Sequence, residues 1–265
     1  MQPTSHATQL VMLASHTVDD AIAAKLSHMS RDLGRLATHK PWLLLFDNNA
    51  GPLDATGLER ARTLDAHVFP WSLAQLYSLF PKLQHSFASS RAVFFSTNEY
   101  LQHYFLFHAS LVLWHRYFGH QYPRLRHIWR VEPDVALVGR GGWAALLTRA
   151  SHMQTDVLLP RLTRETDSDP HYRTHWQLNS GFTRNVPAEQ RAWSLVCVGR
   201  YSLNFLLGVM TPQWTDGVIA YEEIFLPTSC LANANCSVAD FGTLVDGRGV
   251  RFRPAWECEH VQRAA

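Results

Sequence analysis

Apolar residues along the chain form runs typical of buried strands, separated by stretches with helical spacing. The first run, QLVMLAS at residues 9–15, predicts a buried strand. From Val18 to about Leu36 apolar residues recur at helical spacing, with Ser15 and Thr17 as candidate caps. PWLLLFDNN, which begins at Pro41, predicts a second strand that ends in polar residues. A strand, a helix and a strand in this order indicate an α/β sheet.

The same pattern predicts the remaining elements. Residues 67–81 are expected to be an aromatic loop region, and residues 98–118 a long buried helix. Another helix is expected over residues 188–207. The other expected elements are strands at 92–96, 129–139 and 156–162, a helix at 143–151, a loop at 163–173, a helix start at 221–228, and short strands near 238–242 and 250–260. No internal repeat or linker interrupts the chain, which indicates one domain of two abutting halves.

Composition narrows the class of protein. The chain has 265 residues, of which 46% are hydrophobic and only 17% charged, as in a compact globular protein. A net charge of +2, with no long run of Lys or Arg, argues against nucleic-acid binding. No apolar stretch reaches the roughly 18 residues of a membrane-spanning helix. The N-terminus lacks a signal-peptide pattern, so we expect a cytoplasmic protein or a chain that has lost a targeting segment.

The four cysteines do not decide the compartment. Cys230 and Cys236 lie in a loop-like stretch, at a separation that a disulfide could close. Cys197 lies in an apolar run. We favour free buried thiols over a bridge at this stage.

WRVEPDVALVG, residues 129–139, places two acids inside a predicted strand. Glu132 and Asp134 are two residues apart, so they point to the same face of an ideal strand, and Pro133 stops the ladder there. Two carboxylates at a strand end suit a hard cation such as Mg²⁺ or Mn²⁺. The alternative is that one acid pairs with Arg130 or Arg126 and the other caps a turn.

Two further clusters carry candidate chemistry. Glu222 and Glu223 lie near the start of the helix predicted by AYEEIFLPT. Carboxylates there either stabilise the helix dipole or provide a general base at a cleft wall. Asn179, Ser180 and Gly181 form either an ordinary turn or a loop that allows a ligand to approach the backbone closely.

The order of these motifs resembles that of a known family. A strand-ending E-x-D, a later N-S-G-F and then Y-E-E-I-F-L-P-T are similar to the motifs of GT-A-fold glycosyltransferases, in particular a group distantly related to xylosyltransferases and core-2 branching enzymes. The resemblance spans roughly residues 9–242. It implies a GT-A-like (Rossmann-like) mixed sheet flanked by helices in a single α/β domain over residues 1–265. About 1–140 would bind the nucleotide sugar and about 141–265 the acceptor.

The resemblance also implies roles for the carboxylates. Asp134 would bind the metal on the donor diphosphate, and Glu132 would support it at the ribose or at a metal-bound water. Glu223, or failing that Glu222, would be the base of an inverting displacement. The implied cofactors are Mn²⁺ or Mg²⁺ and a nucleotide-sugar donor, with a UDP-sugar favoured. The acceptor would be a hydroxyl of a carbohydrate or glycoconjugate, and a Golgi-lumen location is then the second possibility.

The resemblance implies roles for further positions as well. The loop of Asn179, Ser180 and Gly181 would line the donor sugar or the acceptor. Asp47 and Asn48 would lie near the nucleotide base or ribose, and His260 would be a further metal ligand.

The first acid of the E-x-D motif, Glu132, is Glu instead of Asp. A glycosyltransferase that works without a metal is therefore a second possibility. Arg248, Arg251 and Arg253 would then neutralise the diphosphate, although their alternation is also that of a strand with a solvated face. Two other functions compete: a metal-dependent phosphodiesterase or nuclease that uses Glu132 and Asp134, and a non-catalytic carbohydrate-binding module on the same fold.

Overall fold

A computed structural model describes residues 7–36, 40–47, 59–61, 63–89, 105–137, 142–167, 180–240 and 250–252, with only the backbone described at Asp47, Ser89, Ser180 and 250–252. The strands are β1 (Gln9–Ser15), β2 (Trp42–Asp47), β3 (His67–Ser72), β4 (His127–Val131), β5 (Val135–Leu137), β6 (Val157–Leu159), β7 (Thr163–Arg164), β8 (Ala192–Trp193), β9 (Val198–Ser202), β10 (Val238–Asp240) and β11 (Val250–Phe252). The helices are α1 (Asp20–Gly34), α3 (Leu73–Leu79), α4 (Pro81–Ser89), α6 (Ala109–Phe118), α7 (Gly142–Ser151), α9 (Ser180–Thr183), α10 (Thr211–Thr215) and α11 (Glu222–Leu231), with the π-helix η6 (Asn204–Met210) and the 3₁₀ turns η2 (Gly119–Gln121), η3 (Glu165–Asp167) and η5 (Ala188–Gln190).

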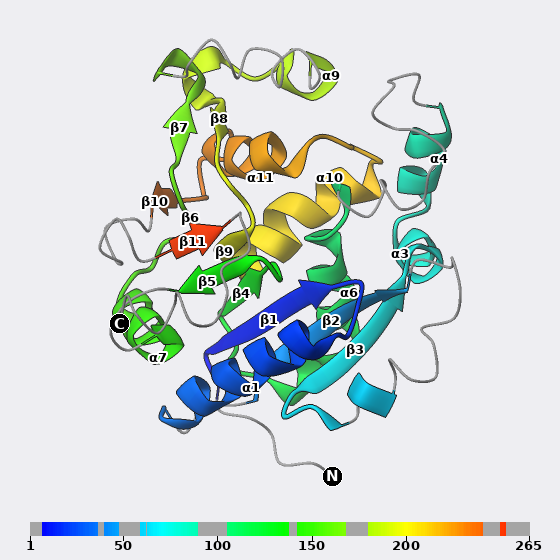
Figure 1. Cartoon of the computed structure of the whole chain (residues 1–265). Helices are drawn as coiled ribbons and strands as arrows, with labels where there is room; N and C mark the ends of the chain where they lie inside the picture. Colours follow the sequence, from blue (N-terminus) through cyan, green and yellow to red (C-terminus); the bar gives the residue numbers. More distant parts are fainter. Residues whose placement is uncertain are drawn as a thin grey trace.

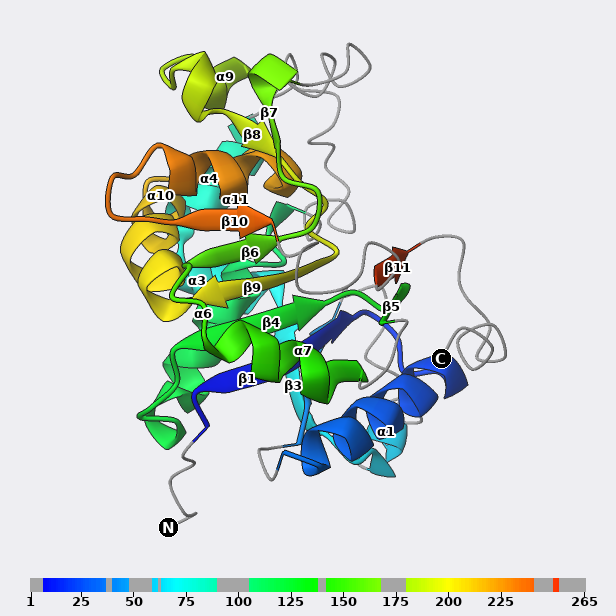
Figure 2. The same cartoon turned by 90° about the vertical axis from the view of Figure 1, so that its left-hand side faces the viewer.

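A seven-stranded mixed sheet forms the centre of the molecule, in the order β10-β6-β9-β4-β1-β2-β3. Six strands run in one direction, and β9 runs against its neighbours β4 and β6. The reversed arrow of β9 is visible in Figure 2. The predicted α/β fold with a mixed sheet flanked by helices is therefore confirmed. The sheet also takes strands from both predicted halves, whose separate roles stay a prediction.

Strict alternation along the central strands builds one core on each face of the sheet. Leu10 and Met12 of β1 point into the larger core, whereas Val11 and Leu13 point into the smaller one. The smaller core lies under α1 and α7, and the larger one lies under α3, α4, α6, η6, α10 and α11 (Figure 1). Neighbouring side chains on a strand point to opposite faces, so burial of a whole strand requires two such layers.

The first strand–helix–strand unit forms largely as predicted. β1 has the expected bounds, β2 starts one residue later than expected, at Trp42, and the two strands pair in parallel. Helix α1 begins at Asp20, two residues later than predicted, because the Asp19 side chain accepts a hydrogen bond from the Ile22 amide. The predicted caps Ser15 and Thr17 instead form a turn, in which the Thr17 amide donates to Ser15 Oγ over 3.2 Å.

The prediction of an aromatic loop at residues 67–81 is wrong. This segment holds β3, α3 and the start of α4. Pro70 lies within β3, and β3 is the edge strand, where a residue without an amide hydrogen is tolerated. Ser72 and Gln75 then form a reciprocal capping box that starts α3.

The helix predicted over residues 188–207 is also wrong. The range instead holds the short 3₁₀ turn η5, the strands β8 and β9, and the start of η6 at Asn204. β9 is buried on both faces, including Arg200 and Tyr201, so its sequence lacks the alternation that marks a half-buried strand. The predicted helix at 98–118 is shorter in the described part of the chain, where α6 starts at Ala109; the strand predicted at 92–96 lies outside the described residues.

Two further expectations have clear outcomes. Cys230 and Cys236 form a disulfide, so the preference for free thiols at these positions is wrong. Cys197 is free, as expected. Among the described residues, no helix is both long and apolar enough to cross a membrane.

Candidate functional site

The acidic motif lies where the central strand β4 ends. The strand stops at Val131, and residues 132–134 form a turn before β5 begins. The Glu132 amide donates to the Cys197 carbonyl over 2.8 Å, and the Val135 amide donates to the Glu132 carbonyl over 3.2 Å. The prediction that the ladder stops at Pro133 is therefore confirmed.

This turn lies at the point where the strand order reverses. The chain builds β1, β2 and β3 outward to one side, and β4 then pairs in parallel with the other side of β1. In open α/β sheets, ligands bind in the crevice beyond the carboxyl ends of the two strands that flank such a reversal. Figure 2 shows β5 and β11 beyond the arrowheads of β1 and β4. The acidic turn thus lies at the edge of the sheet where a ligand is expected.

Lys25 of helix α1 makes hydrogen bonds to the backbone of the turn that carries Glu132 and Asp134. Its Nζ donates to the carbonyl of Glu132 over 2.8 Å and to that of Pro133 over 2.9 Å. A third, short hydrogen bond joins Nζ to the Val135 carbonyl. Burial lowers the pKa of Lys25 to about 8, and the charges of Asp134 and Glu132 oppose this shift. The sequence gives no local signal for this contact, because Lys25 precedes Glu132 by 107 residues.

The Glu132 carboxylate is paired inside the protein. It lies 3.1 Å from the guanidinium of Arg130, which is fully buried. Arg130 also donates to the Val196 carbonyl over 3.0 Å, and its guanidinium lies 4.6 Å above the ring centroid of Phe107. This is the pairing with Arg130 that the sequence left open as the alternative. Its consequence is that the charge of Glu132 is largely compensated before any ligand arrives.

Three predicted carboxylates act on one thiol, which shows that the fold brings them together. Burial, together with the charges of Glu132, Asp134 and Glu223, raises the pKa of Cys197 to about 12, and the charge of Arg130 opposes this shift. Cys197 directly precedes β9, the strand next to β4. Glu223 therefore shares one electrostatic environment with two acids that precede it by about ninety residues in the sequence.

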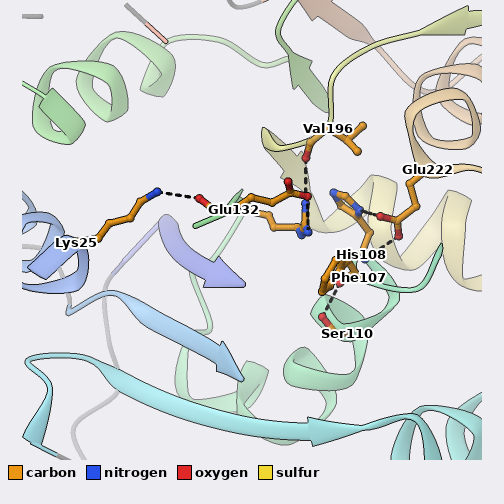
Figure 3. A network of polar contacts seen from close by, with 8 residues as sticks. Lys25, Phe107, His108, Ser110, Glu132, Val196 and Glu222 are labelled. Carbon is orange, nitrogen blue, oxygen red and sulfur yellow. Dashed lines mark hydrogen bonds and ion pairs between the residues drawn. The ribbon is translucent and has the colours of Figure 1, made fainter. Parts of the chain in front are cut away.

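The two acids of α11 have different surroundings. Glu222 is buried, and its carboxylate accepts from the His108 backbone amide over 2.9 Å and lies 2.6 Å from His108 Nδ1. Burial lowers the pKa of His108, and the charge of Glu222 opposes this shift. Figure 3 shows Glu222 turned toward the chain just before α6. Glu222 is therefore engaged by His108, which the sequence had not indicated as a partner.

Glu223 is only half-buried. The Tyr221 hydroxyl donates a hydrogen bond to it, and burial together with the Glu223 charge raises the pKa of Tyr221 to about 12. The Glu223 carbonyl accepts from the Ser194 amide over 2.9 Å, which fixes the backbone next to β8. Of the two acids, Glu223 is the one with access to solvent.

The other predicted positions are less closely tied to this site. Asp47 ends β2 at the same edge of the sheet, in register with Ser72 of β3. Ser180 and Gly181 belong to the one-turn helix α9, so the expected loop is helical here, and a Cβ at Gly181 would have nothing within 4 Å. Asn48, Asn179, His260, Arg248 and Arg253 lie outside the described residues. Arg251 lies in β11 opposite Ala136, which confirms the predicted strand.

Metal ligands are sparse in the described part of the chain. No group of three or more His, Cys, Asp and Glu side chains there could hold a metal ion. Mg²⁺, however, usually keeps several waters and binds proteins through one or two carboxylates plus the phosphates of the substrate. Asp134, half-buried at the strand end, fits such a cation as a single protein ligand. Glu132 fits it less well, since Arg130 already shares its carboxylate.

Comparison with known proteins identifies no family for the chain. No protein-family model matches the chain, and no curated protein matches it. Among solved structures, the chain is similar to the apo form of mouse xyloside xylosyltransferase 1 at 13% identity, with a TM-score of 0.45, over 84% of this chain and 81% of that one. At this TM-score the likeness carries no argument. The α/β fold accordingly stands on the sheet itself.

Proposed function

We propose that the protein is a glycosyltransferase that moves a sugar from a nucleotide-sugar donor to a hydroxyl acceptor. One observation carries the proposal: the Glu132 amide donates to the Cys197 carbonyl at the carboxyl end of β4, beside the reversal of strand order, and the charges of Glu132, Asp134 and Glu223 all act on Cys197. That place suits a nucleotide. The order of the motifs, which resembles that of GT-A-fold glycosyltransferases, narrows the ligand to a nucleotide sugar, with UDP favoured.

The donor diphosphate would lie against the turn of residues 132–134. Asp134 is the protein ligand we assign to a divalent cation there, Mn²⁺ or Mg²⁺. When bound, the cation would neutralise charge on the leaving diphosphate. Arg130 holds Glu132 in place, so Glu132 supports the site as part of a buried ion pair.

Glu223 is the residue we assign as general base. It is half-buried, whereas Glu222 is taken up by His108. In the proposed displacement the acceptor oxygen forms a bond to the anomeric carbon while the bond from that carbon to the phosphate oxygen breaks. The acceptor proton passes to Glu223, and the nucleoside diphosphate leaves with the bonding electron pair. This single displacement inverts the anomeric configuration.

A thermal-shift screen tests the proposal without knowledge of the acceptor. Wild-type protein is heated with UDP, GDP, CMP or ADP, each with and without Mn²⁺. The proposal expects a rise in Tm with one nucleoside diphosphate, largest when Mn²⁺ is present. Stabilisation by a single-stranded oligonucleotide with metal would support a nuclease instead. Stabilisation by oligosaccharides, together with no response to any nucleotide, would support a binding module.

A further inference from the structure

Lys25 presents a cation to the candidate donor site from a helix that sequence reasoning did not connect with it. An ammonium group has three N–H donors and no acceptor. All three donors of Lys25 are used by carbonyls of one short turn, those of Glu132, Pro133 and Val135. Figure 3 shows the Lys25 side chain extended toward Glu132. The carbonyls of the turn at residues 132–135 therefore surround the positive charge of a protein side chain.

Convergence of carbonyl oxygens on one point is how proteins hold cations. Backbone carbonyls and carboxylates are the usual ligands of Ca²⁺, and rings of carbonyls replace the water around K⁺. Here the point is occupied by Nζ, and the carboxylates of Asp134 and Glu132 act on it electrostatically. Burial lowers the pKa of Lys25 to about 8, a value at which most of the group is still protonated at neutral pH.

The ammonium is fixed in space because its helix is fixed. α1 buries Ile22, Leu26, Met29 and Leu33 in the core on its face of the sheet. Ile22 lies three residues before Lys25, at helical spacing, so the aliphatic part of the lysine starts beside a buried side chain of α1. A charge held this way loses little entropy when a ligand binds.

We propose that Lys25 is a positioning residue that acts as the built-in cation of the donor site. It holds the turn of residues 132–135 closed, and it places one positive charge beside Asp134. This inference rests on the proposed function and deepens it, because it assigns part of the charge neutralisation of a diphosphate to the protein itself.

The two ligands of the site should respond to this charge in opposite directions. A diphosphate is attracted by the ammonium, whereas a divalent cation on Asp134 is repelled by it. Removal of the charge should weaken metal-free diphosphate binding and strengthen Mn²⁺ binding, each by roughly tenfold for a charge at short range in a partly buried site. A lysine that only stabilised the fold would, on removal, weaken both.

The experiment compares Lys25→Met with Lys82→Met. Lys82 is an exposed lysine of α4 that pairs with Asp216 over 3.0 Å, and it serves as the matched control. Binding of Mn²⁺ is measured by electron paramagnetic resonance of the free ion, without nucleotide. Binding of UDP and of inorganic pyrophosphate is measured by calorimetry in EDTA. We expect opposite tenfold changes for Lys25→Met, no change for Lys82→Met, and values near wild type for Lys25→Arg.

Two results would overturn the inference: loss of affinity for both ligands in Lys25→Met, or no change for either. If Lys25→Met does not fold, Lys25→Gln, which keeps an amide donor but no charge, is measured in the same way, and wild-type affinities in that variant also overturn the inference. Should wild-type protein bind neither UDP nor pyrophosphate in EDTA and also fail to bind UDP with Mn²⁺, the proposed function fails. The Mn²⁺ measurement then tests the inference about Lys25 by itself. An unchanged affinity for Mn²⁺ in Lys25→Met overturns that inference.

Discussion

His108 and Glu222 form a buried pair, with Nδ1 2.6 Å from Oε2 and side chains that are 0% and 4% exposed. The same carboxylate accepts from the His108 backbone amide over 2.9 Å. The pair links the start of α6 to the start of α11, and α11 carries Glu223 in its first turn. One acid of the predicted Glu-Glu motif thus anchors the helix that presents the other.

Loss of this anchor should reduce stability strongly. Glu222→Ala leaves the His108 ring and backbone amide buried without their acceptor, and a buried donor left unsatisfied typically costs about 1 to 3 kcal/mol in the free energy of unfolding. Glu222→Gln keeps an acceptor for the amide and should cost less. Unfolding in guanidinium chloride measures both, with exposed Glu189→Ala as control. Equal midpoints for Glu222→Ala and Glu189→Ala would show that the pair does not support the fold.

Cys197 should react slowly with iodoacetamide. Its pKa of about 12 leaves far less thiolate at pH 8 than an ordinary cysteine has, so the rate should be lower by about a thousandfold and should still rise with pH above 9. Glu223→Gln should increase the rate, because it removes one of the charges that raise the pKa. Mass spectrometry of the peptide that contains residue 197 follows the reaction. A rate typical of a free thiol would contradict the proximity of these carboxylates.

His127 should make the protein less stable in mild acid. Burial and the charge of Arg200 lower its pKa from 6.5 to about 4 in the folded protein, whereas the unfolded chain keeps the ordinary value. Between these values the unfolded state binds more protons, so stability is complete above about pH 6.5 and falls as the pH drops toward 4. The free energy of unfolding of His127→Gln should depend less on pH over this range. Parallel curves for the two proteins would contradict the assignment.

Glu223→Gln should separate binding from chemistry. The amide keeps the size of the side chain but accepts no proton, so kcat for donor turnover should fall by about 10²- to 10⁴-fold. Because we assign the metal to Asp134 and not to Glu223, the affinity for nucleoside diphosphate with Mn²⁺ should stay near that of wild type. Release of the nucleoside diphosphate gives the rate, and calorimetry gives the affinity. Unchanged turnover would assign the base to another residue.

Local patterns were sufficient where a clear apolar run is bounded by polar residues or by proline. β1 and β2 follow from their apolar runs, and the stop after Val131 follows from Pro133. β9 could not be predicted in this way. A strand buried on both faces has the same apolar character as a buried helix, and its place between β4 and β6 is decided by long-range pairing.

The candidate site also combines residues that local patterns indicated with residues that only long-range contacts reveal. The sequence indicated Asp134 and Glu223 because acids flanked by apolar residues are unusual. It did not indicate Lys25 or His108, since an ordinary lysine on a helix and one of fifteen histidines carry no local signal. Their roles arise from contacts with residues more than a hundred positions away. The charge balance of the site therefore could not be predicted from the sequence without the fold.

Calorimetry of wild type and Asp134→Ala with a UDP-sugar and Mn²⁺ tests the central claim most directly. Asp134 is the one carboxylate that we assign to the metal on the donor diphosphate, and exposed Asp216→Ala serves as control for loss of an aspartate elsewhere. We predict metal-dependent binding to wild type and to Asp216→Ala, and a loss of at least about tenfold in affinity for Asp134→Ala. Full donor binding and full donor hydrolysis by Asp134→Ala would contradict the account.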